Sequence, residues 1–579
     1  MGLGGRGQRC LSVLRSGLTR NFLWVVGLLL WVGLSAAPAL AGPADPFPEP
    51  RPLDRSEAAT FLADPATEQQ LLNSKIAGML DQPAAADVDP AQKRALGLLL
   101  ARPVLAYERA WGAADHTVVR YTIAEGAPDR IPRVDLDHNG VPDRVQIVGQ
   151  GLAQARELLV ERMGFEAPVG LEVVLANLGG RYDGYLIPGE RSGTRMTAVI
   201  DSTARQGVET TRRAAIRQYA HAVSRSLGAG LGAGWAEAFA QWAVLTVDGA
   251  PDDITASLVS NRLEHLDAGL FAEDSTLAAG NAIWLSFLSE SYGLVAVRLT
   301  IQELARDSAD ALALDRALQR ATEDDLASAF REFHLWSILT GRRADAYHFP
   351  FAAELSAPRF ASANQGLPAL SVQADPAVAA WGAAQVLIRP EATDGGLRVR
   401  FEGDFAATWE ADLVVVTRDD TLRRLSIELS DGRGEIAVPL GSVREAFLLV
   451  RSLHSDDGQA RHYTYSAHRE RGYPFEIAAV DAVTNRVGPG VVISWETLSE
   501  QELIGFNVLR AREAGGQTVT VNNLWIPALG NENDATGYFF LDPTAEAGVA
   551  YLYRIQGITS QGMTSTSRPV SVRPSVRAR

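Results

Sequence analysis

The spacing of apolar and turn-forming residues changes at about Pro358, and this change limits the possible folds most strongly. Before it, strand-like pieces alternate with longer segments of helical spacing. After it, short alternating strands are separated by Gly, Asp and Pro, as in "LRVRFEGDFAATWEADLVVVTRDD". At 579 residues the chain is also too long for a single hydrophobic core. We therefore predict a multidomain α+β protein: an α+β domain with a largely helical second half, followed by two all-β sandwich domains.

The first 41 residues predict a signal peptide. They contain arginines and no acidic residue, then the apolar run "FLWVVGLLLWVGL", then small residues that favour cleavage after Ala41. An uncleaved membrane anchor is the alternative, although the apolar run is shorter than the roughly 20 residues that a span needs. We expect a secreted or periplasmic protein, or one at the cell surface, with no stable membrane span after cleavage.

Charge and cysteine content exclude several functions. Removing the four arginines of the signal peptide changes the formal charge from −15 to −15 − 4 = −19, which repels nucleic acid and anionic membranes. We expect no nucleic-acid partner. The single cysteine, Cys10, lies in the signal peptide, so the mature chain has no thiol nucleophile or thiolate metal ligand.

Changes in composition suggest four segments after the signal peptide. They are a linker and helical lead-in at 42–115, an α+β domain at 116–356, a β-sandwich at 365–470 and a second β-sandwich at 473–575. The last segment contains "VVISWETLSEQELIGFNVLRA" and a strand with Tyr-x-Tyr in "GVAYLYRIQGITSQG". This pattern resembles a fibronectin type III module, an Ig-like β-sandwich.

An acidic loop, "DLDHNGVPD", has the spacing of a calcium site. Calcium prefers six to eight oxygen ligands, and alternate loop positions supply them around a glycine turn. Gln146 occupies the twelfth position, where a calcium-binding loop usually has a bidentate Glu. The alternative is an Asn-Gly turn with solvated acids. The expected ligands are the side chains of Asp135, Asp137, Asn139 and Asp143 and the carbonyl of Val141.

The segment "RQYAH" lies in a predicted helix where a zinc peptidase would have His-Glu-x-x-His. Such an enzyme needs three protein ligands, a bound water and a general base. Arg217 cannot ligate a metal because its guanidinium stays protonated, and Gln218 cannot accept a proton from water. His221 and Glu237 remain. They predict a vestigial site, and we do not expect zinc as a cofactor.

Several alternatives stay open for this site. The His221–Glu237 pair could be a hydrogen-bonded core contact, or Arg217 could pair with Glu237 in place of a metal. Another histidine could restore a ligand if the fold brought it close. The histidines in or near the domain are His116, His138, His265, His334 and His348. The tryptophans of this region, Trp235, Trp242, Trp284 and Trp336, are predicted to lie in the core.

The order of motifs resembles a bacterial family of secreted zinc metallopeptidases. This chain has "RYTIAEGAPD", "DLDHNGVPDRVQ", "WAEAFAQW", "NAIWLSFLSESYG" and "FREFHLWSILTGRR" in that order over roughly 230 residues. The family has a His-Glu-x-x-His helix and a Trp-x-Glu-x-x-Ala-x-Trp helix. The resemblance implies that His221 is the second zinc histidine and Glu237 the third ligand. Arg217 and Gln218 replace the first histidine and the catalytic glutamate, so the chain resembles a degenerate member.

Three functional hypotheses follow. The leading one is an exported, catalytically inactive metallopeptidase-like protein, a scaffold that binds a peptide or protein ligand at a peptidase-like cleft and has a calcium-stabilised loop. The second is an active secreted zinc metallopeptidase with a displaced ligand set. The third is an adhesin or structural protein of the cell envelope.

Overall fold

The computed structural model describes the chain from residue 54 to residue 574 with internal gaps. The described ranges are 54–62, 72–81, 89–113, 116–189, 195–203, 207–228, 230–306, 310–364, 367–390, 395–418, 420–440, 443–470, 475–485, 488–500, 503–530, 536–560 and 564–574. The predicted signal peptide, 1–41, and its cleavage after Ala41 lie outside them. Within the described ranges, every helix is too short or too polar to span a bilayer.

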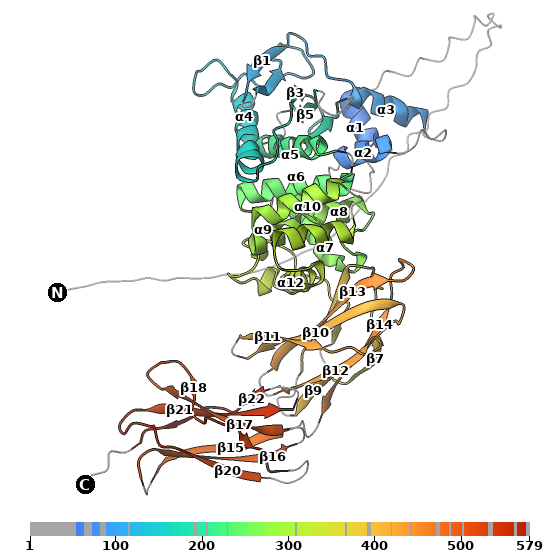
Figure 1. Cartoon of the computed structure of the whole chain (residues 1–579). Helices are drawn as coiled ribbons and strands as arrows, with labels where there is room; N and C mark the ends of the chain where they lie inside the picture. The colour runs from blue at the N-terminus through green and yellow to red at the C-terminus, as the bar shows by residue number, and fades with distance from the viewer. Residues whose placement is uncertain are drawn as a thin grey trace, which may run out of the picture. The chain divides into compact units, whose positions relative to one another are not determined.

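The described residues form an N-terminal α/β region with a helical middle, followed by antiparallel sheets consistent with β-sandwiches (Figure 1). The predicted multidomain architecture, with an α/β region that becomes helical before about Pro358 and strands after it, is therefore confirmed in outline. This architecture could be predicted because buried apolar residues recur about every 3.6 positions in a helix and every two positions in a strand.

Three short helices form the lead-in: α1 (Arg55–Leu62), α2 (Leu72–Asp81) and α3 (Pro90–Leu100). Asp89 caps α3, because its carboxylate accepts a hydrogen bond from the backbone N–H of Ala91 at 2.9 Å. Apolar side chains of all three helices pack with Tyr185 and Val199 of the sheet in one hydrophobic cluster. The lead-in is therefore part of the packed α/β region.

The first sheet is mixed, with the order β1 (Arg109–Gly112), β2 (Val118–Tyr121), β3 (Glu172–Ala176), β5 (Thr197–Asp201) and β4 (Gly184–Ile187). β3 pairs in parallel with both β2 and β5, and all its residues are buried. Its apolar run "VVL" suits a central parallel strand. β1 precedes the boundary that we predicted at His116, since this short, mostly exposed strand has little apolar alternation.

Three helices carry the candidate site. α4 (Asp143–Arg156) continues as a π-helical turn, η2 (Glu157–Arg162), and packs on α5 (Val208–Ser226), which packs on α6 (Ala233–Asp248) (Figure 1). At Gly151 of α4, a Cβ atom would lie 2.4 Å from the backbone oxygen of Arg212. This close approach requires glycine, and it holds α5 directly against α4.

The helical middle continues with α7 (Asp253–Glu264), α8 (Ser275–Gly280), α9 (Ala282–Tyr292), α10 (Leu294–Arg306), α11 (Ala311–Ala321) and α12 (Leu326–Ile338). Trp284 of α9 packs edge-on against Phe333 of α12, with ring centroids 5.2 Å apart. Trp235, Trp242 and Trp284 are buried, as predicted for core residues, and Trp336 is half-buried against the same core.

The first β-sandwich packs on α12. Its sheets have the orders β11-β10-β13-β8-β6 and β12-β9-β14-β7. Ile338 of α12 lies in a hydrophobic cluster with Leu387, Val414 and Phe447 of the first of these sheets. The strands are β6 (Ser362–Asn364), β7 (Ala369–Gln373), β8 (Gly382–Ile388), β9 (Gly396–Gly403), β10 (Ala407–Thr417), β11 (Leu422–Ile427), β12 (Arg433–Pro439), β13 (Val443–Ser455) and β14 (Tyr463–Glu470).

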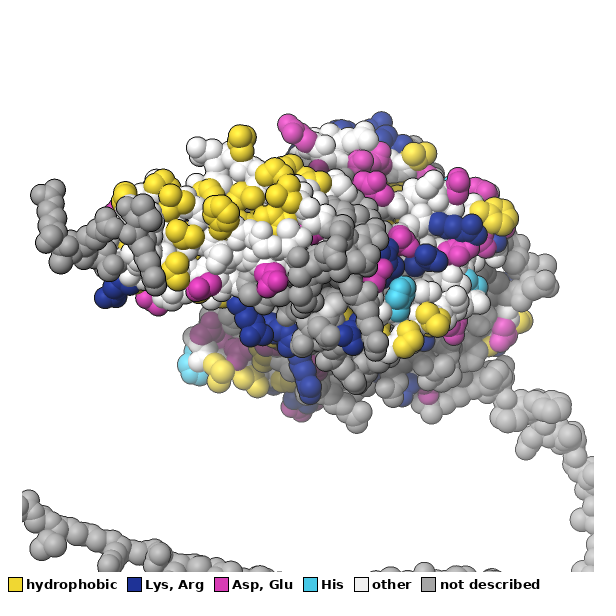
Figure 2. All heavy atoms as spheres, turned by 90° about the horizontal axis from the view of Figure 1, so that it is seen from below, with side chains coloured by type: hydrophobic (Ala, Val, Ile, Leu, Met, Phe, Trp, Pro, Cys, Tyr) yellow, Lys and Arg dark blue, Asp and Glu magenta, His cyan; other side chains and the backbone are white. Residues whose placement is uncertain are grey.

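The second β-sandwich has a three-stranded sheet, β15-β16-β20, and a larger sheet built around β17 and β21. Val483, Phe539 and Leu541 are exposed on the three-stranded sheet, and Figure 2 shows apolar side chains gathered on one face of the molecule. The strands are β15 (Phe475–Thr484), β16 (Val491–Glu500), β17 (Leu503–Arg512), β18 (Val519–Thr520), β19 (Ile526–Pro527), β20 (Thr536–Asp542), β21 (Tyr551–Thr559), β22 (Thr564–Thr566) and β23 (Val570–Val572).

Candidate functional site

The helix α5 carries Arg217, Gln218 and His221, and all three side chains are buried. α5 is buried along most of its length because it lies between α4 and α6 and also contacts β4 and β5. A polar side chain in such a helix must find partners inside the protein, because water does not reach it.

Arg217 is 3% exposed and is held by two carboxylates. Its Nη1 donates to Asp183 Oδ2 at 2.6 Å, and its Nη2 donates to Asp252 Oδ2. Its Nε donates to Gln241 Oε1 at 3.1 Å. Every nitrogen of this guanidinium therefore has a partner, and the position that a first zinc histidine would occupy is filled by a cation with its own counter-ions.

The net pKa shifts of the two carboxylates have opposite signs. Burial raises the pKa of Asp183, and Arg217 opposes this rise. Burial also acts to raise the pKa of Asp252, but Arg217 and the hydrogen bonds from Thr255 hold that pKa below its ordinary value. Burial would lower the pKa of Arg217, yet Asp183 and Asp252 keep it above its ordinary value. The guanidinium is therefore charged.

His221 and Glu237 meet beside this network. His221 Nε2 lies 3.1 Å from Glu237 Oε2, and the Gln241 side-chain amide donates to Glu237 Oε1 at 2.8 Å. Burial would raise the pKa of Glu237, but His221, Gln241 and Arg217 lower it. Arg217 is thus linked to Glu237 through Gln241, whereas our alternative had the two in direct contact. Sequence reasoning missed Gln241, which lies in "WAEAFAQW" one helical turn after Glu237.

Gln218 makes a structural contact. Its Oε1 accepts a hydrogen bond from Asn73 Nδ2 at 3.3 Å, and Asn73 Oδ1 accepts one from the backbone N–H of Leu186 at 2.8 Å. Gln218 therefore links α5 to α2 and, through Asn73, to β4. An amide has no ionisable proton acceptor at neutral pH, so this side chain cannot activate water as a carboxylate would.

The residues around His221 do not fit zinc. His221 Nε2 and Glu237 Oε2 are buried and lie within ion-pair distance of each other, but they are only two ligands and the neighbouring position holds Arg217. A zinc site needs three protein ligands or more. Of the other histidines, His334 is buried on α12 and contacts Gln385, and His348 contacts Asp345. Among the described residues, the side chains of His116, His138 and His265 form no ion pair or metal-ligating cluster with His221 or Glu237.

The acidic loop brings three carboxylates together. Ligand oxygens of Asp135, Asp137 and Asp143 lie within 4.8 Å of one another, so this cluster could bind a metal ion. In the described part of the chain it is the one group of three or more His, Cys, Asp or Glu side chains placed this way. Gly140 has φ 85°, in the left-handed region, which permits the turn that brings the acids together.

The remaining loop residues are engaged in hydrogen bonds. Asn139 Oδ1 accepts from the backbone N–H of Val141 at 2.8 Å. Gln146, on the first turn of α4, donates its side-chain amide to the Val141 carbonyl at 3.0 Å and to Asp137 Oδ1 at 3.3 Å. The Gln146 side chain, at the twelfth position of the loop, therefore directs an amide N–H at two of the expected calcium ligands, Asp137 and the Val141 carbonyl.

The comparisons show distant structural likeness only. No protein-family profile matches the chain, and no curated protein matches its sequence. The chain resembles the adhesin domain of Epf from Streptococcus pyogenes at 10% identity, covering 34% of this chain and 72% of that one, with a TM-score of 0.15. It resembles the chicken CNTN1 FN1–FN3 domains at 10% identity, covering 30% and 55%, with a TM-score of 0.13.

A third structure is a bacterial glycosidase. The β-1,2-glucanase from Parabacteroides distasonis is 12% identical over 32% of this chain and 29% of that chain, with a TM-score of 0.13. The chain thus spans less than a third of the glucanase and about half of the CNTN1 fragment. These are distant matches to fibronectin type III domains and to bacterial adhesin and glycosidase proteins, and they carry no conclusion about a metallopeptidase.

Proposed function

We propose that this chain is an exported, catalytically inactive metallopeptidase-like protein that serves as a binding scaffold for a peptide or protein ligand. The observation that carries the proposal is the buried Arg217, held between Asp183 and Asp252. Its cation stands where the resemblance implies the first zinc histidine. The second β-sandwich is proposed to be a fibronectin type III-like module that adds a further protein-binding or spacing element.

The loss of hydrolysis follows from two deficits. His221 and Glu237 provide two ligands, one fewer than a catalytic zinc requires. Gln218 provides no base to remove a proton from bound water, and its oxygen is engaged by Asn73. A positive guanidinium near the pair adds electrostatic repulsion against a divalent cation.

The acidic loop is proposed to hold calcium as a structural ion. Asp135, Asp137 and Asp143 would supply carboxylate oxygens, and Asn139 and the carbonyl of Val141 would complete the set. The hard oxygen donors favour calcium over zinc. The ion would tie the loop to the start of α4, because Asp143 is the first residue of that helix.

The test restores the peptidase residues without leaving buried charges unpaired. Replacing Arg217 alone would strand Asp183 and Asp252 without their counter-ion. We would therefore compare the natural protein with the Arg217→His/Gln218→Glu/Asp183→Asn/Asp252→Asn variant. Asn at 252 still caps α7. The control is Arg217→Met/Asp183→Asn/Asp252→Asn, which removes the same buried charges and keeps Gln218, and so adds neither a metal ligand nor a base.

Zinc content per chain is measured after zinc loading and dialysis, with peptide hydrolysis assayed in parallel. The proposal expects no stoichiometric zinc and no hydrolysis in the natural protein and the control, and about one zinc per chain in the quadruple variant. Stoichiometric zinc or hydrolysis in the natural protein would refute it and would support the displaced-ligand enzyme.

A further inference from the structure

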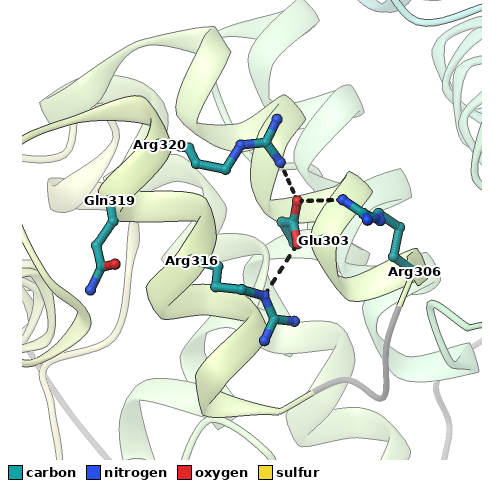
Figure 3. Close-up of a pocket in the computed structure, with 5 residues that line it drawn as sticks. All are labelled: Glu303, Arg306, Arg316, Gln319 and Arg320. Carbon is teal, nitrogen blue, oxygen red and sulfur yellow. Dashed lines mark hydrogen bonds and ion pairs between the residues drawn. The ribbon is translucent and has the colours of Figure 1, made fainter.

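A separate cluster of charged side chains lies on α10 and α11 and shares no residue with the Arg217 network. Glu303 of α10 accepts hydrogen bonds from three arginines, as Figure 3 shows. Arg306 Nη1 lies 3.3 Å from Glu303 Oε1, Arg316 Nε lies 3.4 Å from Oε2, and Arg320 Nη1 also donates to Oε1. Two arginines from α11 and one from the end of α10 therefore meet at one carboxylate.

The carboxylate is buried and the arginines reach outward. The side chain of Glu303 is 4% exposed, whereas those of Arg306 and Arg320 are 72% and 54% exposed. Burial would raise the pKa of Glu303, but the three arginines lower it, so the carboxylate is ionised. Three guanidinium charges and one carboxylate charge leave a local excess of 3 − 1 = +2 in a chain whose formal charge is −15.

These side chains line an open pocket. Glu303, Arg306, Arg316, Gln319 and Arg320 surround a depression with a volume of about 700 Å³. In Figure 3 the guanidinium groups converge from two helices around the Glu303 carboxylate, and the Gln319 side chain lies apart from them, farther from Glu303. Glu303 holds the arginines in place before any ligand arrives, which lowers the entropy cost of binding.

We propose that this pocket binds an oxyanion, a phosphate or sulfate group that is either free or carried as a monoester. A guanidinium is planar and always charged, and its N–H groups match pairs of oxygens on such a group. Each guanidinium has about five N–H donors, so the bonds to Glu303 occupy a small part of the donors on Arg306 and Arg320. The amide of Gln319 adds another donor at the rim.

The charge balance also disfavours other ligands. A cation would be repelled by the local excess of positive charge. A neutral apolar molecule would have to cover exposed guanidinium groups without giving them hydrogen-bond partners. A group with several charged oxygens can bond with both outward-reaching arginines at once, and this geometry favours tetrahedral oxyanions.

The test is isothermal titration calorimetry on the full mature chain with sodium phosphate, sodium sulfate and glycerol phosphate, each at matched ionic strength. The two test variants are Arg306→Gln and Arg320→Gln. Arg306 is the more exposed, so its replacement leaves Glu303 with two arginines and the helices intact. Arg433→Gln is the matched control, since Arg433 is 71% exposed and pairs with Glu402 on the first β-sandwich. Thermal unfolding without anion confirms that each variant is folded.

The proposal expects phosphate or sulfate to bind the natural protein at one site, with affinity falling about tenfold in Arg306→Gln and in Arg320→Gln and staying unchanged in Arg433→Gln. Tighter binding of glycerol phosphate than of inorganic phosphate would identify a monoester as the ligand, and the reverse order would identify the free ion. No heat above a sodium chloride blank, or equal weakening by Arg433→Gln, would overturn the proposal.

Discussion

Arg217 of α5 donates to one carboxylate oxygen of Asp252, and the other oxygen of Asp252 accepts the backbone N–H of Thr255 at 2.8 Å. The side chain of Asp252 therefore both neutralises the buried guanidinium and caps α7. Asp183, on the other side of the guanidinium, completes a buried pair of ion contacts. This arrangement makes Arg217 a structural residue of the helical core.

Replacing Arg217 with Met should destabilise the protein by about 3–5 kcal/mol, because it leaves buried carboxylates without their partner. The free energy of unfolding is measured by chemical denaturation. Adding Asp183→Asn and Asp252→Asn to Arg217→Met should restore much of the loss, since the stranded charges are then removed. As a control, Arg444→Met breaks an exposed ion pair with Asp420 and should change stability by about 1 kcal/mol or less. Equal losses at Arg217 and Arg444 would contradict this account.

The packing of α12 on the first β-sandwich predicts that truncating Ile338 lowers the stability of the protein. Ile338 is fully buried in the cluster that joins α12 to β8, β10 and β13. Ile338→Ala should cost about 2–5 kcal/mol, since it removes buried methyl groups and leaves a cavity. Leu312→Ala, on an exposed position of α11, is the control and should have little effect. Thermal unfolding of both variants checks this, and an unchanged midpoint in Ile338→Ala would show that the interface is not formed.

The sequence predicted those elements whose burial pattern is local. The apolar run "EVVLA" in β3 and the alternation in β9 are visible within a few residues, because strand faces repeat every two positions. β1 was missed, since its four residues are largely exposed and lack alternation. The packing of the lead-in helices on the sheet was also not predicted, because it depends on residues far apart in the chain.

The candidate site was likewise only partly predictable from the sequence. The frame of Arg217, Gln218 and His221 is set by helical spacing, so it could be read from the sequence. The partners of Arg217 could not, because Asp183 and Asp252 lie 34 and 35 residues away and meet it only after the sheet and helices pack. The Asp-Asp pair at 252–253 does predict a helix start, but nothing in it indicates a buried arginine.

The proposal that the acidic loop holds calcium predicts a change in calcium affinity when the twelfth position of the loop is altered. Gln146→Glu would replace an amide N–H, which now faces Asp137 and the Val141 carbonyl, with a carboxylate that can ligate. We expect calcium binding to tighten by about tenfold or more, measured by calorimetry after chelator treatment. Gln150→Glu is the matched control, because it makes the same change one helical turn later at an exposed position of α4. Equal tightening of calcium binding in both variants would show that the added negative charge on α4, and not a new ligand, causes the effect.

His334 predicts how stability depends on pH. It is fully buried on α12, with Nε2 3.1 Å from Gln385 Oε1 of β8. Burial, together with the nearby charge of Arg451, lowers the pKa of His334 from 6.5 to about 3. Between these values the unfolded chain binds a proton that the folded protein excludes. The contribution to stability is therefore complete above pH 6.5 and is lost as the pH falls, by about 1.4 kcal/mol per pH unit.

The window between pH 6.5 and 5 lies above the titration of those carboxylates whose pKa values are lowered. Burial raises the pKa of Asp183 and of Asp267, which acts on stability in the opposite direction, so the comparison with His334→Gln isolates the histidine. Glu237 and Asp252 have lowered pKa values in the folded protein, so they affect stability only below their ordinary values of 4.5 and 3.8. The natural protein should lose about 2 kcal/mol across the window through His334. His334→Gln should remove this slope, whereas His454→Gln, at an exposed position, should keep it. Denaturant unfolding at each pH measures the slopes, and the same slope in all three proteins would show that His334 is protonated in the folded state.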